Sequence, residues 1–63
     1  MLGQVTIQID DAQDRADFVA YVEGECKARV TPHASGAVTV EAVKGGDPLQ
    51  DVLWTVHTWV STH

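Results

Sequence analysis

Hydrophobic and polar residues alternate strictly near the start of the chain. Over residues 4–9, Val5, Ile7 and Ile9 fall on one side of an extended backbone and polar side chains fall on the other. Strict alternation with a period of two is typical of a strand that has one buried face and one solvated face. The pattern therefore predicts a first strand over residues 4–9.

The hydrophobic period lengthens after Asp10 and Asp11. Either carboxylate can cap a helix, because an aspartate oxygen accepts hydrogen bonds from the free N–H groups of the first turn. We expect a helix that runs to about Glu23 and is ended by Gly24, since glycine readily adopts the left-handed conformation that closes many helices. Its predicted apolar stripe comprises Ala12, Ala16, Phe18, Val19 and Val22.

The period returns to two over residues 26–31 and again over residues 38–43. The segment between them contains Pro32, Ser35 and Gly36, which favour a turn. These patterns predict a hairpin of two strands. The apolar side chains expected on its buried face are Cys26, Ala28, Val30, Val38, Val40 and Ala42.

Residues 44–48 predict a loop that leads into a second helix. Asp47 stands at the position of a cap, Pro48 at the first helical position and Gln50 where the partner in a capping box belongs. Apolar residues then recur every three or four positions, with Trp59 at the border of the stripe. The predicted stripe comprises Leu49, Val52, Leu53, Val56 and Val60.

Residues 52–60 also fit a strand, because β-branched and aromatic residues that favour strands are common there. We favour the helix, since capping signals precede the segment and the helical spacing continues through it. The strand remains the alternative.

The order of these elements predicts a single α+β domain over residues 1–63. If the first two strands are parallel, the helix between them forms a right-handed crossover, and the hairpin then inserts the third strand between them, antiparallel to both. The predicted β-α-β-β-α chain has a three-stranded sheet of order 1-3-2 with two helices on one face. On the other face, Glu41 is expected opposite Lys27 or Arg29. This element order resembles a ferredoxin-like fold that lacks its last strand, a resemblance that implies no function.

Composition narrows the classes of function. Four Lys and Arg against nine Asp and Glu give a net charge of −5, which argues against direct nucleic-acid binding. The single cysteine, Cys26, cannot form an internal disulfide, and the first residues lack the basic and apolar regions of a signal peptide. No apolar stretch approaches the roughly 18 residues of a membrane span. We therefore expect a cytoplasmic protein without a membrane partner.

Two segments resemble ligand-binding motifs, but their residues also have simpler structural roles. Asp10, Asp11 and Asp14 form a D-D-x-x-D pattern that suits magnesium and diphosphate, yet acids at a helix start commonly serve as caps. Residues 44–48 place glycines before a helix, as in a phosphate-binding loop, but Asp47 would repel phosphate there. Capping and loop geometry are the favoured interpretations.

Soft and imidazole side chains are few: Cys26, His33, His57 and His63 have a spacing that matches no zinc site. A nucleophilic Cys26 with His57 as its base is a minority alternative, because Cys26 faces the predicted core. We expect no catalytic residue, metal or cofactor, and a protein that is not an enzyme.

The outer side of the second helix is the most informative predicted surface. Trp54 points about 140° away from Leu49 on a helical projection, outside the apolar stripe. Beyond Asp51 the sequence has no Asp, Glu, Lys or Arg. An aromatic residue among uncharged neighbours is typical of an interface core, whereas the alternative is that Trp54 folds down as added core. The predicted interaction residues are Gln50, Trp54, His57, Thr58, Trp59 and Ser61.

The edge of the first strand is a second candidate surface, because a missing fourth strand leaves its backbone groups unpaired. It carries Gln4, Thr6 and Gln8 and no charge until Asp10. A symmetric dimer or a partner peptide could pair with such an edge.

We therefore expect a non-catalytic protein–protein interaction module that associates with itself or with an unidentified protein. An alternative is an acidic inhibitor or nucleic-acid mimic, in the manner of small phage accessory proteins, that occupies a basic surface of its partner. A structural subunit of a larger assembly is a further alternative. The acidic residues that would serve the inhibitor are Asp10, Asp11, Asp14, Asp17, Glu23 and Glu25.

Overall fold

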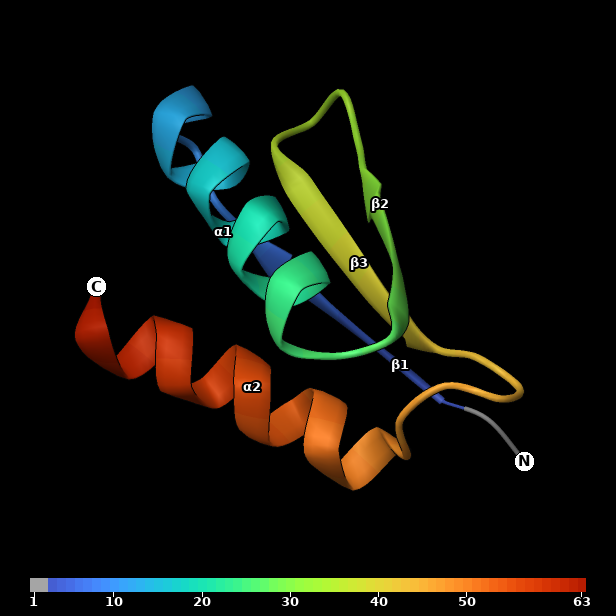
Figure 1. Cartoon of the computed structure of the whole chain (residues 1–63). Coiled ribbons are helices and arrows are strands. Elements are labelled where there is room, and N and C mark those ends of the chain that lie inside the picture. The colour runs from blue at the N-terminus through green and yellow to red at the C-terminus, as the bar shows by residue number, and fades with distance from the viewer. Residues whose placement is uncertain (1–2) are drawn as a thin grey trace.

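The computed structural model describes residues 3–63 and confirms the predicted β-α-β-β-α order (Figure 1). Met1 and Leu2, which enter the single-domain and signal-peptide predictions, lie outside the described residues. The elements are β1 (Gln4–Gln8), α1 (Ala12–Glu25), β2 (Ala28–Pro32), β3 (Ala37–Ala42) and α2 (Leu49–Thr62).

The strand order is β1-β3-β2, as predicted, and β3 pairs antiparallel with both neighbours. Val5 lies opposite Val40 on one side, and Val30 lies opposite Val40 on the other, so one apolar row crosses the inner face. On the outer face Arg29 lies opposite Glu41, with 3.9 Å between Arg29 Nη1 and Glu41 Oε1. Arg29 is therefore the partner of Glu41.

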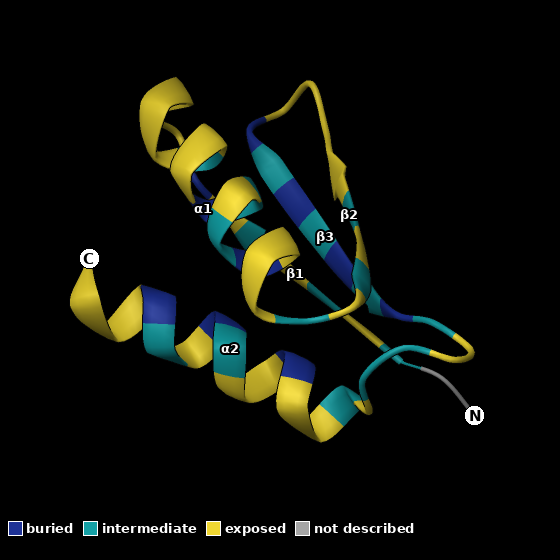
Figure 2. Cartoon of the chain, in the orientation of Figure 1, coloured by how far each residue is buried: buried dark blue, intermediate teal, exposed yellow. Residues whose placement is uncertain are grey.

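The core lies between the inner face of the sheet and both helices (Figure 2). Val38 and Val40 of β3 are fully buried against side chains from each helix, which places α1 and α2 on the same face of the sheet. The ring of Phe18 in α1 packs edge-on against the ring of Trp59 in α2, with 5.0 Å between centroids. The buried residues are Ile9, Phe18, Val22, Val38, Val40, Ala42, Val52, Val56 and Trp59.

Asp11 caps α1 as predicted, because its Oδ1 accepts hydrogen bonds from the N–H groups of Gln13 at 2.9 Å and Asp14 at 3.0 Å. The predicted end of this helix is wrong. Gly24 lies inside α1, and the helix is closed by the backbone N–H of Cys26, whose own backbone is extended. Since Cys26 completes the helix, β2 begins two residues later than expected.

The apolar stripe of α1 is rotated relative to the prediction. Phe18 and Val22 are buried, whereas Ala12 and Ala16 are exposed, and Tyr21 becomes half-buried instead. Large side chains remove much more apolar area from water than alanine methyl groups do, so they determine which side of the helix meets the core.

The predicted capping box of α2 is wrong. Pro48 is the N-cap rather than the first helical residue, and no side chain of residues 3–63 caps the helix, so Asp47 and Gln50 do not form the expected pair. Asp47 Oδ2 accepts a hydrogen bond of 2.7 Å from the backbone N–H of Lys27, and the N–H of Asp47 donates to the Lys27 carbonyl at 3.1 Å. The carboxylate therefore fastens the loop to the start of β2.

Residues 52–60 are helical, so the strand alternative is wrong. The threonine hydroxyls form hydrogen bonds to the preceding turn of the helix. Thr55 donates to the Asp51 carbonyl at 3.0 Å and Thr58 to the Trp54 carbonyl at 2.8 Å. Neither α1 nor α2, which are the helices of the described range, is long and apolar enough to cross a bilayer.

Candidate functional site

Large apolar side chains are exposed along one side of α2. Trp54 is 69% exposed, Val60 49% and Leu53 42%. Helical spacing places these residues and His57 on the same side, which we call the α2 outer face. The exposed indole of Trp54 agrees with the sequence prediction, and the alternative in which Trp54 is added core is wrong.

The sequence places Leu53 and Val60 in the buried stripe and Trp59 at its border, and the structure reverses these positions. Trp59 is 6% exposed, whereas Leu53 and Val60 are at the surface. Packing of Trp59 on Phe18 turns α2 toward α1, because an indole buries more area than an aliphatic side chain. Trp59 is therefore a core residue. The signal for this exchange is the apolar arc of α2, which is too wide to be buried on one side.

The C-terminal turn of α2 is held to α1 by a polar contact. Trp59 Nε1 donates to Asp17 Oδ2 at 3.2 Å, and His63 Nε2 lies 3.3 Å from the same oxygen. The imidazole of His63 stacks on Trp59 with 4.0 Å between ring centroids. This contact joins the two helices and occupies Asp17 within the chain.

The four aspartates of the predicted acidic cluster have different surroundings. Asp11 caps α1, Asp17 binds the indole of α2, and Asp10 Oδ1 accepts a hydrogen bond of 2.9 Å from a glutamine side chain of β1. Asp14 is exposed in the first turn of α1. Two of these four carboxylates thus stabilise α1 and its packing.

The start of α2 borders the edge of the sheet at β1. A Cβ atom built on Gly3 would lie 2.6 Å from Leu49 Cδ2, so the start of α2 lies beside the start of β1. On a helical projection Leu53 and Val60 lie within about 40° of Leu49, whereas Trp59 lies about 80° from Leu49 in the other direction. Leu53 and Val60 are therefore on the side of α2 from which Leu49 approaches β1.

A shallow groove of about 610 Å³ runs along the first half of this face. The rings of Trp54 and His57 are 6.0 Å apart and tilted by 35°, and His57 Nε2 lies 3.4 Å from Ser61 Oγ. Thr58 is half-buried and its hydroxyl is already bonded within the helix. The groove is lined by Leu49, Gln50, Asp51, Leu53, Trp54 and His57.

The outer side of β1 is polar. Thr6 Oγ1 lies 2.9 Å from Thr39 Oγ1 across the strand pair, and Gln8 Nε2 donates to the Ser35 carbonyl at 2.8 Å. These side chains bond to their own sheet and do not cover the strand edge. The exposed residues of the strand are Gln4, Thr6 and Gln8.

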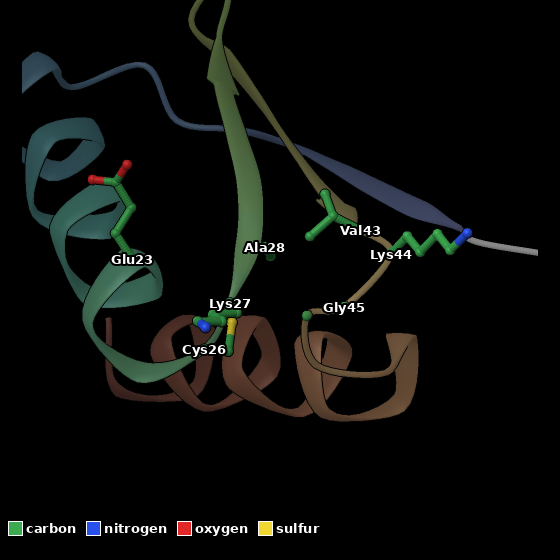
Figure 3. A pocket seen from close by; sticks show the side chains of 8 residues that line it. Glu23, Cys26, Lys27, Ala28, Val43, Lys44 and Gly45 are labelled. Atoms are coloured by element: carbon green, nitrogen blue, oxygen red, sulfur yellow. The ribbon is translucent and has the colours of Figure 1, made fainter.

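A second groove, of about 470 Å³, lies by the loop of residues 44–48 (Figure 3). Figure 3 shows the side chains of Glu23 and Lys44 extending away from one another, on opposite sides of the groove. Gly45 has a positive φ of 83°, and a Cβ on Gly46 would collide with a backbone carbonyl. The glycines therefore serve the tight path of the loop.

Cys26 and His57 have different partners. Cys26 Sγ donates to the Val22 carbonyl at 3.5 Å, and burial raises the pKa of this thiol. His57 lies on the α2 outer face beside Trp54. Within residues 3–63, no three His, Cys, Asp or Glu side chains are placed to hold a metal ion.

The arrangement offers a partly apolar helix face with a single acid, Asp51, at its start, near a strand edge. Such features bind other chains. Comparison of the chain with protein-family models, curated proteins and solved structures finds no match.

Proposed function

We propose that this chain is a non-catalytic protein–protein interaction module that associates through the α2 outer face and the neighbouring β1 edge. The observation that carries the proposal is Trp54, an indole 69% exposed on a helix without a charged residue beyond Asp51. Burying a large apolar side chain contributes about 1.5–3 kcal/mol, so covering Trp54 and Leu53 is a substantial driving force for association.

The distribution of charge supports the same proposal. The chain has a net charge of −5, and six of its nine acids lie in or directly before α1. The other three are Glu41 in β3, Asp47 in the loop before α2 and Asp51 in the first turn of α2. The α2 outer face itself combines Leu53, Trp54, His57 and Val60. Depletion of charge around an aromatic residue is characteristic of interface cores. We also propose a cytoplasmic location, because the free thiol of Cys26 suits a reducing compartment.

Replacing Trp54 with Glu tests the proposal, because a carboxylate at this position opposes burial of the face. We expect Trp54→Glu to reduce either the molar mass of the protein in solution, measured by sedimentation equilibrium, or its capture of a partner protein. Ala16→Glu is the matched control, since Ala16 is exposed on α1 and acquires the same charge. Circular dichroism verifies that both variants fold. Equal mass and equal capture for both variants would contradict the proposal.

A further inference from the structure

The backbone groups of β1 that face away from the sheet can be assigned. The Gly3 carbonyl accepts a hydrogen bond of 2.9 Å from Ala42 N–H, and Ile9 N–H donates to the Gly36 carbonyl at 2.9 Å. In an antiparallel pair, both backbone groups of alternate residues point to the same neighbour. The odd-numbered residues of this segment therefore face β3. The residues whose N–H and C=O groups point outward, with no described residue paired to them, are Gln4, Thr6 and Gln8.

The sequence of β1 is nearly the same in both directions. It reads Gln-Val-Thr-Ile-Gln, with Thr6 at its centre. If two copies pair antiparallel with Thr6 opposite Thr6, Val5 of each copy meets Ile7 of the other, and Gln4 meets Gln8. All outward backbone groups then find partners, because the outward residues coincide with the hydrogen-bonded pairs. Such self-complementarity is what a two-fold symmetric interface requires.

Electrostatics also permits this pairing, although each copy has a net charge of −5. The strand itself is uncharged. Asp10, the nearest acid along the chain, lies beyond the paired segment. Antiparallel pairing places the two Asp10 residues at opposite ends of the contact, so the like charges stay apart.

The α2 outer face continues the same surface. Val5 and Ile7 are only half-buried on the inner side of β1, in contrast to the fully buried Val38 and Val40 of the central strand. A strand added at β1 extends the sheet beneath the side of α2 that borders it. Leu49 already lies beside the start of β1, so one contact covers the strand edge together with the start of α2.

The area required agrees with the use of both surfaces. A stable dimer buries about 800 Å² on each partner. This is roughly one fifth of the 4212 Å² that the chain exposes. A five-residue strand edge supplies only part of that area, so the proposed contact has to extend onto the neighbouring start of α2.

The opposite edge, at β2, is unsuited to the same contact. His33 N–H donates to the Ala37 carbonyl at 2.8 Å, so the outward residues of this edge are Ala28, Val30 and Pro32. Pro32 has no N–H to donate. Proline and charged side chains are the usual protection of an exposed edge, and Arg29 supplies the charge. The chain thus has one protected edge and one open edge.

We propose that the partner of the module is a second copy of this chain, joined by antiparallel pairing of β1 with β1 about a two-fold axis at Thr6. The inference rests on the proposed function, because it identifies the partner of the same surface. The pairing creates a continuous six-stranded sheet from two three-stranded ones, with the helices of both copies on the same face.

A pair of lysine variants tests the contact, because Thr6 in β1 and Thr31 in β2 both lie opposite Thr39. Thr6→Lys places two like charges at the axis and is expected to raise the dissociation constant of the dimer at least about tenfold. Thr31→Lys, at the protected edge, is expected to leave it unchanged. Sedimentation equilibrium compares the 6.8 kDa monomer with a particle of twice that mass, and circular dichroism verifies folding.

Mixing Thr6→Lys with Thr6→Glu tests the register, since residue 6 faces its own copy only in the proposed pairing. We expect each variant to be weakened alone and the mixture to recover the dimer at low salt. A monomeric wild-type chain, equal behaviour of Thr6→Lys and Thr31→Lys, or failure of the mixture would overturn this inference. The proposed function is tested separately. It would stand, without this dimer, if Trp54→Glu abolished capture of a different protein. It would fail together with the dimer if Trp54→Glu changed neither mass nor capture.

Discussion

The two helices have the same length of 14 residues and cover the same sheet, yet they meet solvent differently. α1 begins at a side-chain cap on Asp11 and exposes alanines and acids. α2 begins at Pro48 without such a cap and exposes an indole and aliphatic side chains. The exposed side of α1 is therefore well solvated and its first turn is capped by its own chain. In contrast, α2 retains an exposed apolar face that water solvates poorly. Net charge alone does not show this difference, which depends on where the acids lie.

The largest expected effect comes from removing the buried ring of Phe18, which packs between the two helices. Phe18→Ala deletes a fully buried side chain, and we expect the free energy of unfolding to fall by about 3–5 kcal/mol. That loss is comparable to the whole stability of a small domain. Urea denaturation followed by circular dichroism measures it.

Trp54→Ala is the matched control, because it deletes an aromatic ring from the exposed face of α2. At a concentration where the protein is a 6.8 kDa monomer, Trp54→Ala should change the free energy of unfolding by no more than about 0.5 kcal/mol. A cost as large as that of Phe18→Ala would show that the α2 outer face belongs to the core.

The helix starts provide a smaller test. Asp11→Ala removes the cap of α1 and should lower the free energy of unfolding by about 1 kcal/mol. Asp51→Ala removes an acid from the first turn of α2 that is not its cap, so only the weaker interaction with the helix dipole is lost. If both variants cost the same in urea denaturation, capping would not distinguish the helices.

The smallest expected effect concerns Cys26, which follows α1 and lies beside Thr55 of α2. Burial raises the pKa of this thiol, so the folded state favours the neutral form. The associated stability is present at neutral pH and is lost as the pH rises through the folded-state pKa. Between neutral pH and about pH 10, unfolding free energy should fall more in the wild type than in Cys26→Ala. Parallel pH curves for the two proteins would contradict this expectation.

Sequence periodicity was sufficient for the element order, the strand order and the exposure of Trp54, because these depend on local alternation and spacing. It was insufficient for the rotation of each helix. Whether Trp59 or Leu53 faces the core is decided by the ring of Phe18, which is distant along the chain. Asp47 has the local signature of a cap, but the backbone N–H that it binds belongs to Lys27, twenty positions earlier.

The same limits apply to the candidate site. Gln50, His57 and Ser61 lie on or beside the exposed side of α2 as predicted, while Trp59 exchanges places with Leu53 and Val60. An apolar arc that is too wide for one face indicates that some residues stay outside, but local spacing does not identify which ones.

The two indoles of α2 also give the protein separate fluorescent reporters of unfolding and of the proposed association. The indole of Trp59 is buried between Phe18 and His63, so its emission maximum shifts when unfolding exposes it to water. The indole of Trp54 is already exposed to water in the folded chain, so its emission maximum shifts only when another surface covers it. Variants that retain a single tryptophan would therefore follow folding and association separately, from adjacent turns of one helix and without any added label.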